Sequence, residues 1–256
     1  MPSLAHLVKV GIMAQSYPLF FFKTIDSTQS KIKLMISEDK ALEDFTTVVA
    51  GQQLKGRGRG VSVWQDSEGK SALMSVFVRW PQPIGESFDV NRWVCHCLGA
   101  ILPKDVRFKW PNDLMVGDQK LGGMLIENHW GKSGIRSSII GLGVNVKRFD
   151  GMLCRAISLE DLGMEVEPME VVDEVVRTFQ GQLSAIQNKA LINRRYDALL
   201  WGKLEYQTYE LAGGARVEAK VQGVDENGQL ILELQGKKNV QAFDLDAIKW
   251  VNPFSN

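Results

Sequence analysis

A glycine-rich basic segment, residues 53–60, is the first part of this sequence whose residue types suit ligand chemistry. It reads Gln-Leu-Lys-Gly-Arg-Gly-Arg-Gly and is followed by Trp64. Alternate glycines let a backbone fold closely around a ligand, and the arginines between them are planar donors for carboxylate or phosphate. The tryptophan could then cover the bound group. The alternatives are a flexible basic loop and an RNA contact; the spacing is not that of a Walker A loop.

A second segment, residues 109–113, reads Lys-Trp-Pro-Asn-Asp and stands at the end of a predicted strand. Pro111 should bend this strand, which would present Asn112 and Asp113 at its edge. Two basic residues on one face of the strand would lie near the carboxylate. A carboxylate close to two cations is what a magnesium–phosphate site needs, and a surface cluster of salt bridges is the alternative.

A third segment, residues 120–123, reads Lys-Leu-Gly-Gly just beyond a hairpin turn at residues 117–118. Strand alternation predicts that Lys120 and Gly122 share one face. Glycine within a strand often marks the close approach of a ligand or of another backbone. A lysine over a glycine surface suits an anionic or carbonyl-bearing ligand, and an exposed lysine beside a bulge is the alternative.

A fourth segment, residues 141–145, reads Gly-Leu-Gly-Val-Asn. Its alternate positions Gly141, Gly143 and Asn145 share one face in a strand. This face would be a flat floor with an amide at its end. A sheet that packs against something bulky is the alternative.

The fifth segment, residues 26–29, reads Asp-Ser-Thr-Gln at a strand-to-helix junction. Its hydroxyl groups can cap the helix, or they can form hydrogen bonds with the polar head of a buried ligand.

The composition limits the class of protein that can carry these segments. The chain has 256 residues, and thirty Lys and Arg balance thirty Asp and Glu. This balance excludes a strongly basic nucleic-acid-coating chain and an acidic disordered tail. No apolar run approaches the roughly 20 residues that span a bilayer, and the N-terminus is expected to be a leader of little structure rather than a signal peptide.

Cysteine usage indicates a reducing compartment, and cytoplasm is the expected location. The three cysteines, Cys95, Cys97 and Cys154, make no disulfide framework. Residues 95–97 read Cys-His-Cys, but zinc needs about four ligands and no second Cys/His cluster follows. We therefore expect no tightly bound zinc and a structural role for this stretch on a helix.

Hydrophobic periodicity predicts an α+β fold with a central, mostly antiparallel sheet flanked by helices. The predicted strands are residues 17–25, 46–53, 72–79, 106–110, 113–116, 119–130 and 135–145. The predicted helices are residues 29–38, 88–102 and a single helix from Pro168 to about Trp201. The period changes to two after Gly202, and residues 216–224, 229–235 and 240–251 predict four or five short strands. We expect a catalytic domain over residues 1–203 and a small barrel-like β module over residues 204–256.

The five segments, in this order, resemble the biotin protein ligase (biotin–[acetyl-CoA-carboxylase] ligase) family. The Lys-Trp-Pro-Asn-Asp run is the specific part, whereas Gly-Arg-Gly is shared with many chains. The resemblance implies a class II aminoacyl-tRNA-synthetase-like catalytic fold and an SH3-like C-terminal β-barrel. It also implies that biotin and ATP form biotinyl-5′-AMP and pyrophosphate with Mg²⁺. A lysine of a biotin carboxyl carrier protein then attacks this adenylate, which gives an amide and AMP.

The resemblance also assigns roles to residues of this sequence. The residues that would bind biotin are Ser27, Thr28, Gln29, Gln53, Gly56, Arg57, Gly58, Arg59, Lys120, Gly122, Gly123 and Gly141. Those that would bind ATP and the adenylate are Arg57, Arg59, Trp64, Lys109, Asn112, Asp113, Lys120 and Asn145. The catalytic residues would be Lys120, which would offset charge that develops on oxygen, together with Arg59 and Asp113. Asp113 is also the candidate magnesium ligand.

Two departures from the family pattern qualify the resemblance. Gln29 stands where bacterial relatives commonly have Asn, and residues 60–64 form a less basic loop than many bacterial ligases have, which predicts a less tightly held adenylate. The repressor-type members carry an N-terminal winged helix-turn-helix. Only residues 1–16 precede the first predicted strand here, so we expect a monofunctional ligase with no specific DNA target.

Three other functions compete with this interpretation. A lipoate ligase or octanoyltransferase shares the fold, but the Gly-Arg-Gly-Arg and Lys-Trp-Pro-Asn-Asp runs favour biotin. An RNA- or DNA-binding module is disfavoured by the zero net charge. An inactive binding protein is disfavoured by the intact Lys120 and Asp113. A membrane is not an expected partner, and an exposed edge strand could serve either a homodimer or the carrier protein.

Overall fold

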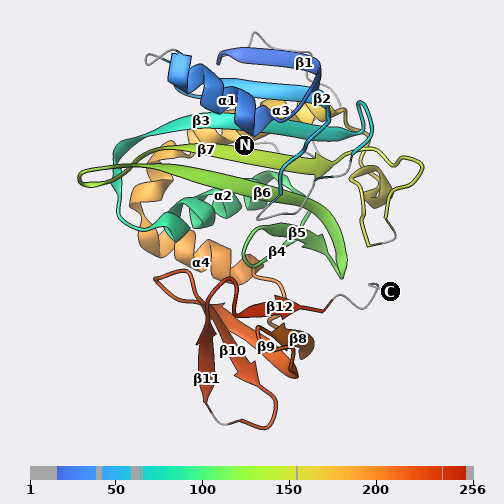
Figure 1. The fold of residues 1–256 in the computed structure, drawn as a ribbon, viewed down its shortest axis with the longest axis vertical. Helices are drawn as coiled ribbons and strands as arrows, with labels where there is room; N and C mark the ends of the chain where they lie inside the picture. Colours follow the sequence, from blue (N-terminus) through green and yellow to red (C-terminus); the bar gives the residue numbers. More distant parts are fainter. Residues whose placement is uncertain are drawn as a thin grey trace.

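The computed structural model describes residues 16–38, 42–58, 64, 66–153, 155–237 and 239–251. A seven-stranded sheet forms the larger part of the molecule, and a five-stranded sheet lies at one end of it (Figure 1). The expected N-terminal leader, Arg59 and Cys154 lie outside the described residues. Within the described ranges, no helix is both long and apolar enough to cross a lipid bilayer.

The large sheet is mostly antiparallel, as predicted. Its strands are β1 (Leu19–Ile25), β2 (Thr47–Gln53), β3 (Ser71–Ile84), β4 (Arg107–Lys109), β5 (Asp113–Val116), β6 (Gln119–Gly131) and β7 (Gly134–Asn145). Their order across the sheet is β1-β2-β3-β7-β6-β5-β4. Only the β1–β2 pair is parallel among the described strands, because the helix between them carries the chain back along the sheet.

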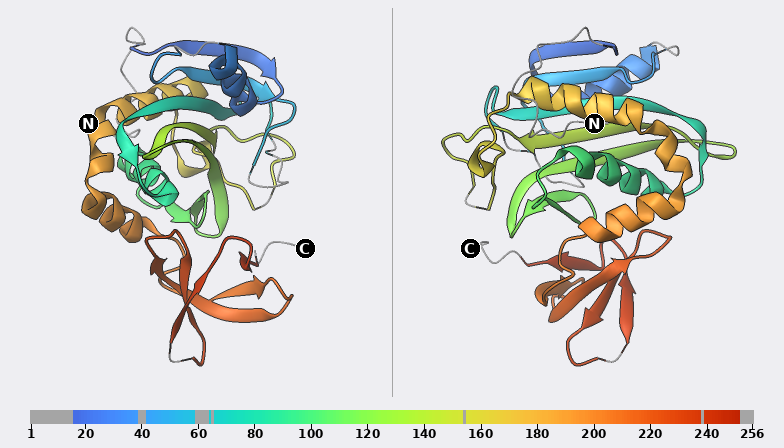
Figure 2. Two further views of the ribbon diagram at one scale, coloured as in Figure 1. Left: turned by 60° about the vertical axis from the view of Figure 1, so that its left-hand side comes forward. Right: turned by 180° about the vertical axis from the view of Figure 1, so that it is seen from behind.

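Helices cover both faces of this sheet. Helix α1 (Thr28–Glu38) packs against β2, β3 and β7 on one face. Helices α2 (Ser87–Ile101), α3 (Pro168–Gly181) and α4 (Lys189–Leu199) cover the other face, as the view from behind in Figure 2 shows. The apolar stripe of α2 is buried as predicted. Its Trp93 is fully buried, with its ring 4.8 Å from that of Phe179 on α3 and 5.1 Å from that of Trp80 on β3.

The prediction of one helix from Pro168 to about Trp201 was wrong. Helix α3 ends at Gly181, a 3₁₀ turn spans Leu183–Gln187, and α4 starts at Lys189. The side chain of Asn188 accepts a hydrogen bond from the backbone N–H of Leu191 at 3.0 Å. This cap satisfies a free donor of α4 and lets the chain change direction, which a continuous apolar pattern does not reveal.

The C-terminal β module is an antiparallel sheet of five strands. They are β8 (Gln207–Leu211), β9 (Arg216–Val224), β10 (Leu230–Leu234), β11 (Val240–Phe243) and β12 (Ile248–Trp250). Their order is β11-β10-β9-β8-β12, so β11 and β12 are the two edges of the described ladder. Strand β8 lies outside the predicted strand ranges, and the domain boundary near residue 203 stays a prediction.

Hydrogen bonds attach the C-terminal module to the end of the large sheet. The indole N–H of Trp201 donates to the carbonyl of Gly117 at 2.8 Å. The indole N–H of Trp110 donates to the carbonyl of Gly228 at 2.9 Å. The Trp110 bond joins the β4–β5 connection to the C-terminal module, and the Trp201 bond holds the chain just before that module against the β5–β6 turn. The small sheet therefore faces the same region of the large sheet that carries the predicted site.

Candidate active site

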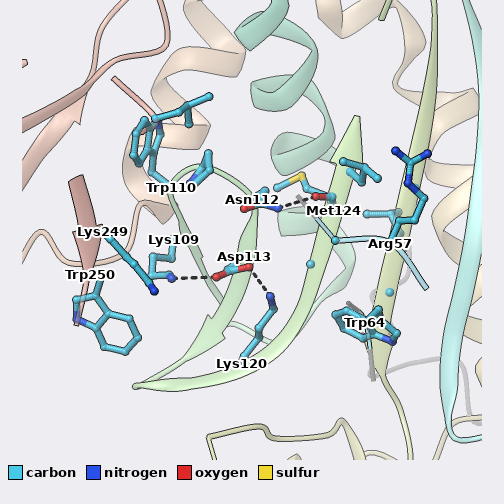
Figure 3. A pocket seen from close by; sticks show the side chains of 18 of the residues that line it. Arg57, Trp64, Lys109, Trp110, Asn112, Asp113, Lys120, Met124, Lys249 and Trp250 are labelled. Atoms are coloured by element: carbon cyan, nitrogen blue, oxygen red, sulfur yellow. Dashed lines mark hydrogen bonds and ion pairs between the residues drawn. The ribbon is translucent and has the colours of Figure 1, made fainter. Parts of the chain in front are cut away.

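A cavity of about 650 Å³ lies between the large sheet and the C-terminal module. Figure 3 shows part of its wall, with the ion pairs of Asp113 at the centre. The predicted site residues that line it are Ser27, Thr28, Gln29, Gln53, Arg57, Gly58, Trp64, Lys109, Asn112, Asp113, Lys120, Gly123 and Gly141. Thirteen residues chosen from five separate segments therefore meet at one cavity.

One end of the cavity is formed by buried polar side chains at the start of α1. Gln53 Oε1 accepts hydrogen bonds from the backbone N–H of Thr28 at 2.8 Å and from its hydroxyl at 3.2 Å. The hydroxyl oxygens of Thr28 and Ser75 are 2.9 Å apart, and Ser75 donates to Gln29 Oε1 at 2.9 Å. Ser27 precedes α1, and its Oγ lies 3.4 Å from the backbone N of Ser30. The expected capping hydrogen bond and the expected polar pocket thus occur together.

The glycine floor lies on β7 beneath Trp64. A Cβ atom built on Gly143 would stand 2.8 Å from Cε2 of the Trp64 ring, and one built on Gly141 would stand 2.6 Å from Gln29 Oε1. Gly56 does not line the cavity. Its carbonyl accepts a hydrogen bond from the Trp64 N–H at 3.0 Å, so it positions this side chain instead.

A carboxylate between two ammonium groups forms the other end. Asp113 Oδ2 lies 2.9 Å from Nζ of Lys109, and Oδ1 lies 2.6 Å from Nζ of Lys120. Lys109 and Asp113 are register partners in the tight β4–β5 connection that contains Pro111. Burial by itself raises the pKa of the Asp113 carboxyl, but the two ammonium groups outweigh it, and the pKa is lowered overall.

The prediction that Lys120 and Gly122 share one face of the strand was wrong, and the Lys120 side chain lies over Gly123 instead. Leu114 pairs with Gly122, but Met115 pairs with Lys120, so β6 holds one extra residue, Leu121. Such a β-bulge re-aims the side chains that follow it. A Cβ built on Gly123 would stand 3.4 Å from Nζ of Lys120, whereas one on Gly122 would meet the backbone of β7.

The side-chain amides of two predicted site residues form hydrogen bonds to backbone carbonyls. The amide of Asn112 donates to the carbonyl of Met124 at 3.0 Å at the cavity wall. The amide of Asn145 donates to the carbonyls of Lys120 at 3.3 Å and Ile157 at 3.1 Å. Asn145 is buried and lies outside the lining of the cavity. It supports the backbone of Lys120, and its predicted contact with nucleotide stays a prediction.

The side chains of this site do not form a resident metal centre. Both oxygens of Asp113 are taken by lysines, and the described part of the chain has no group of three or more His, Cys, Asp or Glu placed to hold a metal. Cys95 and Cys97 are fully buried in the core on α2. Mg²⁺ commonly binds through one or two carboxylates together with substrate phosphates, so a bound nucleotide would have to supply most of its ligands.

Sequence reasoning missed the lining residues that come from distant segments. Ser75 lies in an apolar strand, and nothing in its neighbours signals a polar contact. The C-terminal module adds Lys249 and Trp250 to the wall (Figure 3), and Nζ of Lys109 lies 5.0 Å from the centroid of a Trp250 ring. The change of period after residue 202 predicts strands there, but it does not predict that they face the cavity.

The arrangement offers different chemistry at its two ends. The end at α1 offers buried hydroxyl and amide groups for a small polar ring. The floor of glycines beneath an indole suits an apolar chain. The opposite end offers Lys109 and Lys120 around Asp113, with Lys249 on the wall from the C-terminal module, and these ammonium groups suit the negative charge of phosphates.

Comparison with known proteins identifies the domain that forms the large-sheet side of this cavity. Residues 21–145 match the biotin/lipoate A/B protein ligase family. The bifunctional ligase/repressor BirA of Bacillus spizizenii is 28% identical and aligns with 93% of this chain and 76% of its own length. The biotin–[acetyl-CoA-carboxylase] ligase of Mycobacterium tuberculosis is 24% identical, over 76% of this chain and 75% of its own.

Solved structures establish the same fold. The biotin protein ligase of Aquifex aeolicus in complex with biotin and ATP has a TM-score of 0.70 at 22% identity and covers 92% of this chain and 99% of its own. The Leishmania major enzyme in complex with biotinyl-5-AMP has a TM-score of 0.58 at 22% identity, over 89% of this chain and 98% of its own. Residues 21–145 of this chain are therefore a domain of the biotin/lipoate A/B protein ligase family.

Proposed function

We propose that this chain is a biotin–protein ligase, which activates biotin with ATP and transfers it to a lysine of a biotin carboxyl carrier protein. One observation carries the proposal: a single cavity joins a buried end of hydrogen-bonding side chains to an end that carries three lysines. The relatives named above support it, since their names describe biotin ligases.

In the first step, a carboxylate oxygen of biotin attacks the α-phosphorus of ATP, and the bond to the β-phosphate oxygen breaks. The products are biotinyl-5′-AMP and pyrophosphate. Lys120, at the junction of the glycine floor and the charged end, would neutralise charge on the oxygens of the reacting groups. Trp64 over Gly143 would exclude water from the adenylate, which hydrolyses readily.

In the second step, the amine of the carrier lysine attacks the carbonyl carbon of the adenylate. The C–O bond to the phosphate breaks, AMP leaves, and the amide nitrogen loses a proton. Arg57, which is exposed at the rim of the cavity, and Arg59 would hold the adenylate between the steps. Mg²⁺ would enter with ATP as part of the substrate, and we give Asp113 the role of orienting both lysines.

The polar end of the cavity, formed by Thr28, Gln29, Gln53 and Ser75, favours biotin over lipoate. A cyclic urea has N–H donors and a carbonyl acceptor for the groups around Thr28 and Gln53, whereas a dithiolane ring has neither. We further propose that the protein works in the cytoplasm, because an odd cysteine count suits a reducing compartment. We propose no DNA operator for it. An edge strand of the large sheet would receive the carrier protein or a second copy of this chain.

The decisive experiment is ATP-dependent transfer of a radiolabelled acid to a purified carrier domain, with biotin and lipoate compared at equal concentration. We expect biotin to be incorporated at one lysine with release of AMP and pyrophosphate. Lipoate transfer without biotin transfer would support the alternative ligase. Transfer of neither, with a folded protein and Mg²⁺ present, would refute the proposal.

A further inference from the structure

Glu127 lies on β6 outside the cavity, yet a continuous chain of hydrogen bonds joins its carboxylate to the polar end. Gln29 Nε2 donates to Glu127 Oε2 at 2.8 Å. Gln29 Oε1 accepts from the Ser75 hydroxyl at 2.9 Å, and the Ser75 oxygen lies 2.9 Å from that of Thr28. Thr28, Gln29 and Ser75 are each at most 3% exposed, so water cannot readily substitute for a partner in this chain.

The acceptors around Gln29 determine which way its amide points. Its Nε2 faces the carboxylate of Glu127 and the backbone carbonyls of Ile139 at 3.3 Å and Leu125 at 3.5 Å. All three are acceptors, so the NH₂ group must lie on this side and Oε1 on the side of Ser75. The ionised Glu127 is the strongest of the three, because a charged acceptor makes a stronger hydrogen bond than a neutral carbonyl.

Glu127 is held in its ionised form. Burial by itself raises the pKa of its carboxyl, but hydrogen bonds from Lys33 and Gln29 and the charges of Lys33 and Arg57 outweigh burial and lower it overall. Nζ of Lys33 lies 2.7 Å from Glu127 Oε1. The group is therefore an obligate acceptor at neutral pH.

The orientation of the Gln29 amide also fixes the direction of the hydrogen bonds between Gln29 and the cavity wall. Because the Ser75 hydroxyl donates to Gln29, its oxygen can only accept from Thr28. The other neighbour of the Thr28 hydroxyl, Gln53 Oε1 at 3.2 Å, is also an acceptor. The Thr28 hydrogen therefore stays within the protein in either case, and Thr28 presents only lone pairs to the cavity.

The polar end consequently has a defined pattern of donors and acceptors. Thr28 and Gln29 line the cavity, and their side-chain oxygens Oγ1 and Oε1 are acceptors. Gln53 Oε1 accepts from the backbone of Thr28 at 2.8 Å, which leaves the NH₂ group of Gln53 as a donor. Acceptors on one side and a donor on the other match the N–H and C=O groups of a cyclic urea.

We propose that Glu127 is a positioning residue for substrate selection, which fixes the Gln29 carboxamide so that the polar end accepts N–H donors and rejects a ring without them. The inference rests on the proposed biotin ligase function and extends it to a residue that does not contact the substrate. Glu127→Gln is nearly isosteric, but its amide can also donate, so the orientation of Gln29 is no longer imposed.

The test compares Michaelis constants for biotin and ATP with the inhibition constant of lipoate in the wild type and in Glu127→Gln. We expect the KM for biotin to rise about tenfold, as for loss of roughly 1.4 kcal/mol of binding, with the KM for ATP and the lipoate constant unchanged. Glu127→Asp, which keeps an obligate acceptor, should recover most of the biotin affinity. Ser75→Ala removes a hydroxyl from the middle of the same hydrogen-bond chain and should reproduce the rise in the KM for biotin. Glu68→Gln, at an exposed surface ion pair, is the matched control.

Two results would overturn the inference. One is a Glu127→Gln protein that selects biotin over lipoate as well as the wild type does. The other is an equal loss of biotin and ATP affinity, which indicates general distortion of the site. A wild-type protein that does not bind biotin would instead refute the proposed function, and this inference with it.

Discussion

Asp113 and Lys120 form a close ion pair at the charged end of the cavity, with Oδ1 2.6 Å from Nζ. The pair spans two neighbouring strands, β5 and β6, and the β-bulge at Leu121 places the lysine beside Gly123. The lysine is thus held over the glycine surface by a carboxylate that also holds Lys109 at 2.9 Å.

Lys120→Ala should reduce the rate of adenylate formation by at least about 100-fold, as for removal of one donor that stabilises transition-state charge. Single-turnover formation of biotinyl-5′-AMP measures this step. Lys132→Ala, at an exposed position of the β6–β7 turn, should behave as the wild type. A Lys120→Ala protein with a normal rate would remove Lys120 from its proposed role.

Asp113→Asn should lose stability at neutral pH but not in acid. The pKa of the Asp113 carboxyl is lowered in the folded state from its ordinary 3.8. The ionised group therefore stabilises the fold above that value, and this contribution disappears as the pH falls through the lowered pKa. Urea unfolding of both proteins between pH 7 and pH 3 should give a difference in unfolding free energy that shrinks below about pH 4. A difference independent of pH would contradict the prediction.

Gly143→Ala should speed release of the adenylate roughly tenfold, because overpacking of this kind costs about 1–3 kcal/mol. The new Cβ would stand 2.8 Å from the Trp64 ring, which must move off the floor. The off-rate can be followed by chasing labelled adenylate with unlabelled biotin and ATP. Gly213→Ala is the control, since a Cβ at Gly213 meets no atom within 4 Å. Equal off-rates for the two variants would show that Trp64 does not retain the adenylate by covering it.

Lys249→Ala should raise the KM for ATP about tenfold and leave biotin binding unchanged. Lys249 lines the charged end from β12, and a hydrogen bond to a charged group is worth about 1.5–3 kcal/mol. Initial-rate kinetics with each substrate varied separately distinguishes the two effects. Lys237→Ala, exposed elsewhere in the same module, should change neither constant. A rise in the KM for biotin alone would place Lys249 at the wrong end of the cavity.

Arg92→Met should lower the free energy of unfolding by about 1.5–3 kcal/mol, the usual worth of a hydrogen bond to a charged group, since Asp89 keeps Lys189 as a partner with Nζ 2.8 Å from Oδ2. Arg92 and Asp89 are 3% and 2% exposed, with Nη1 3.1 Å from Oδ1. Arg92 also donates to the carbonyl of Val224 at 3.2 Å, which joins α2 to the C-terminal module. Chemical denaturation measures the change, and the exposed Arg195→Met on α4 is the control. A loss below about 1 kcal/mol, typical of a surface pair, would contradict it.

The local hydrophobic pattern predicted most helices and strands, because each type of element repeats its buried residues at a characteristic spacing along one face. The stripe of α2 is an example: its spacing of three and four residues identifies both the helix and its buried side. The break between α3 and α4 was missed, since the apolar residues continue through the 3₁₀ turn and only the cap at Asn188 separates the two helices.

Residue types and spacing, with the family resemblance that they carry, predicted thirteen of the residues that line the cavity. Lys120, Asp113 and the residues around Thr28 each have a structural alternative when taken alone, and their order and spacing along the chain favour the ligand site. Only the tertiary structure decided which neighbours they meet. The bulge at Leu121 selected Gly123 over Gly122, packing of α1 against β3 brought Ser75 to Thr28, and docking of the C-terminal module added Lys249. These contacts join residues far apart in sequence, and their register depends on packing of the whole sheet, which no local pattern encodes.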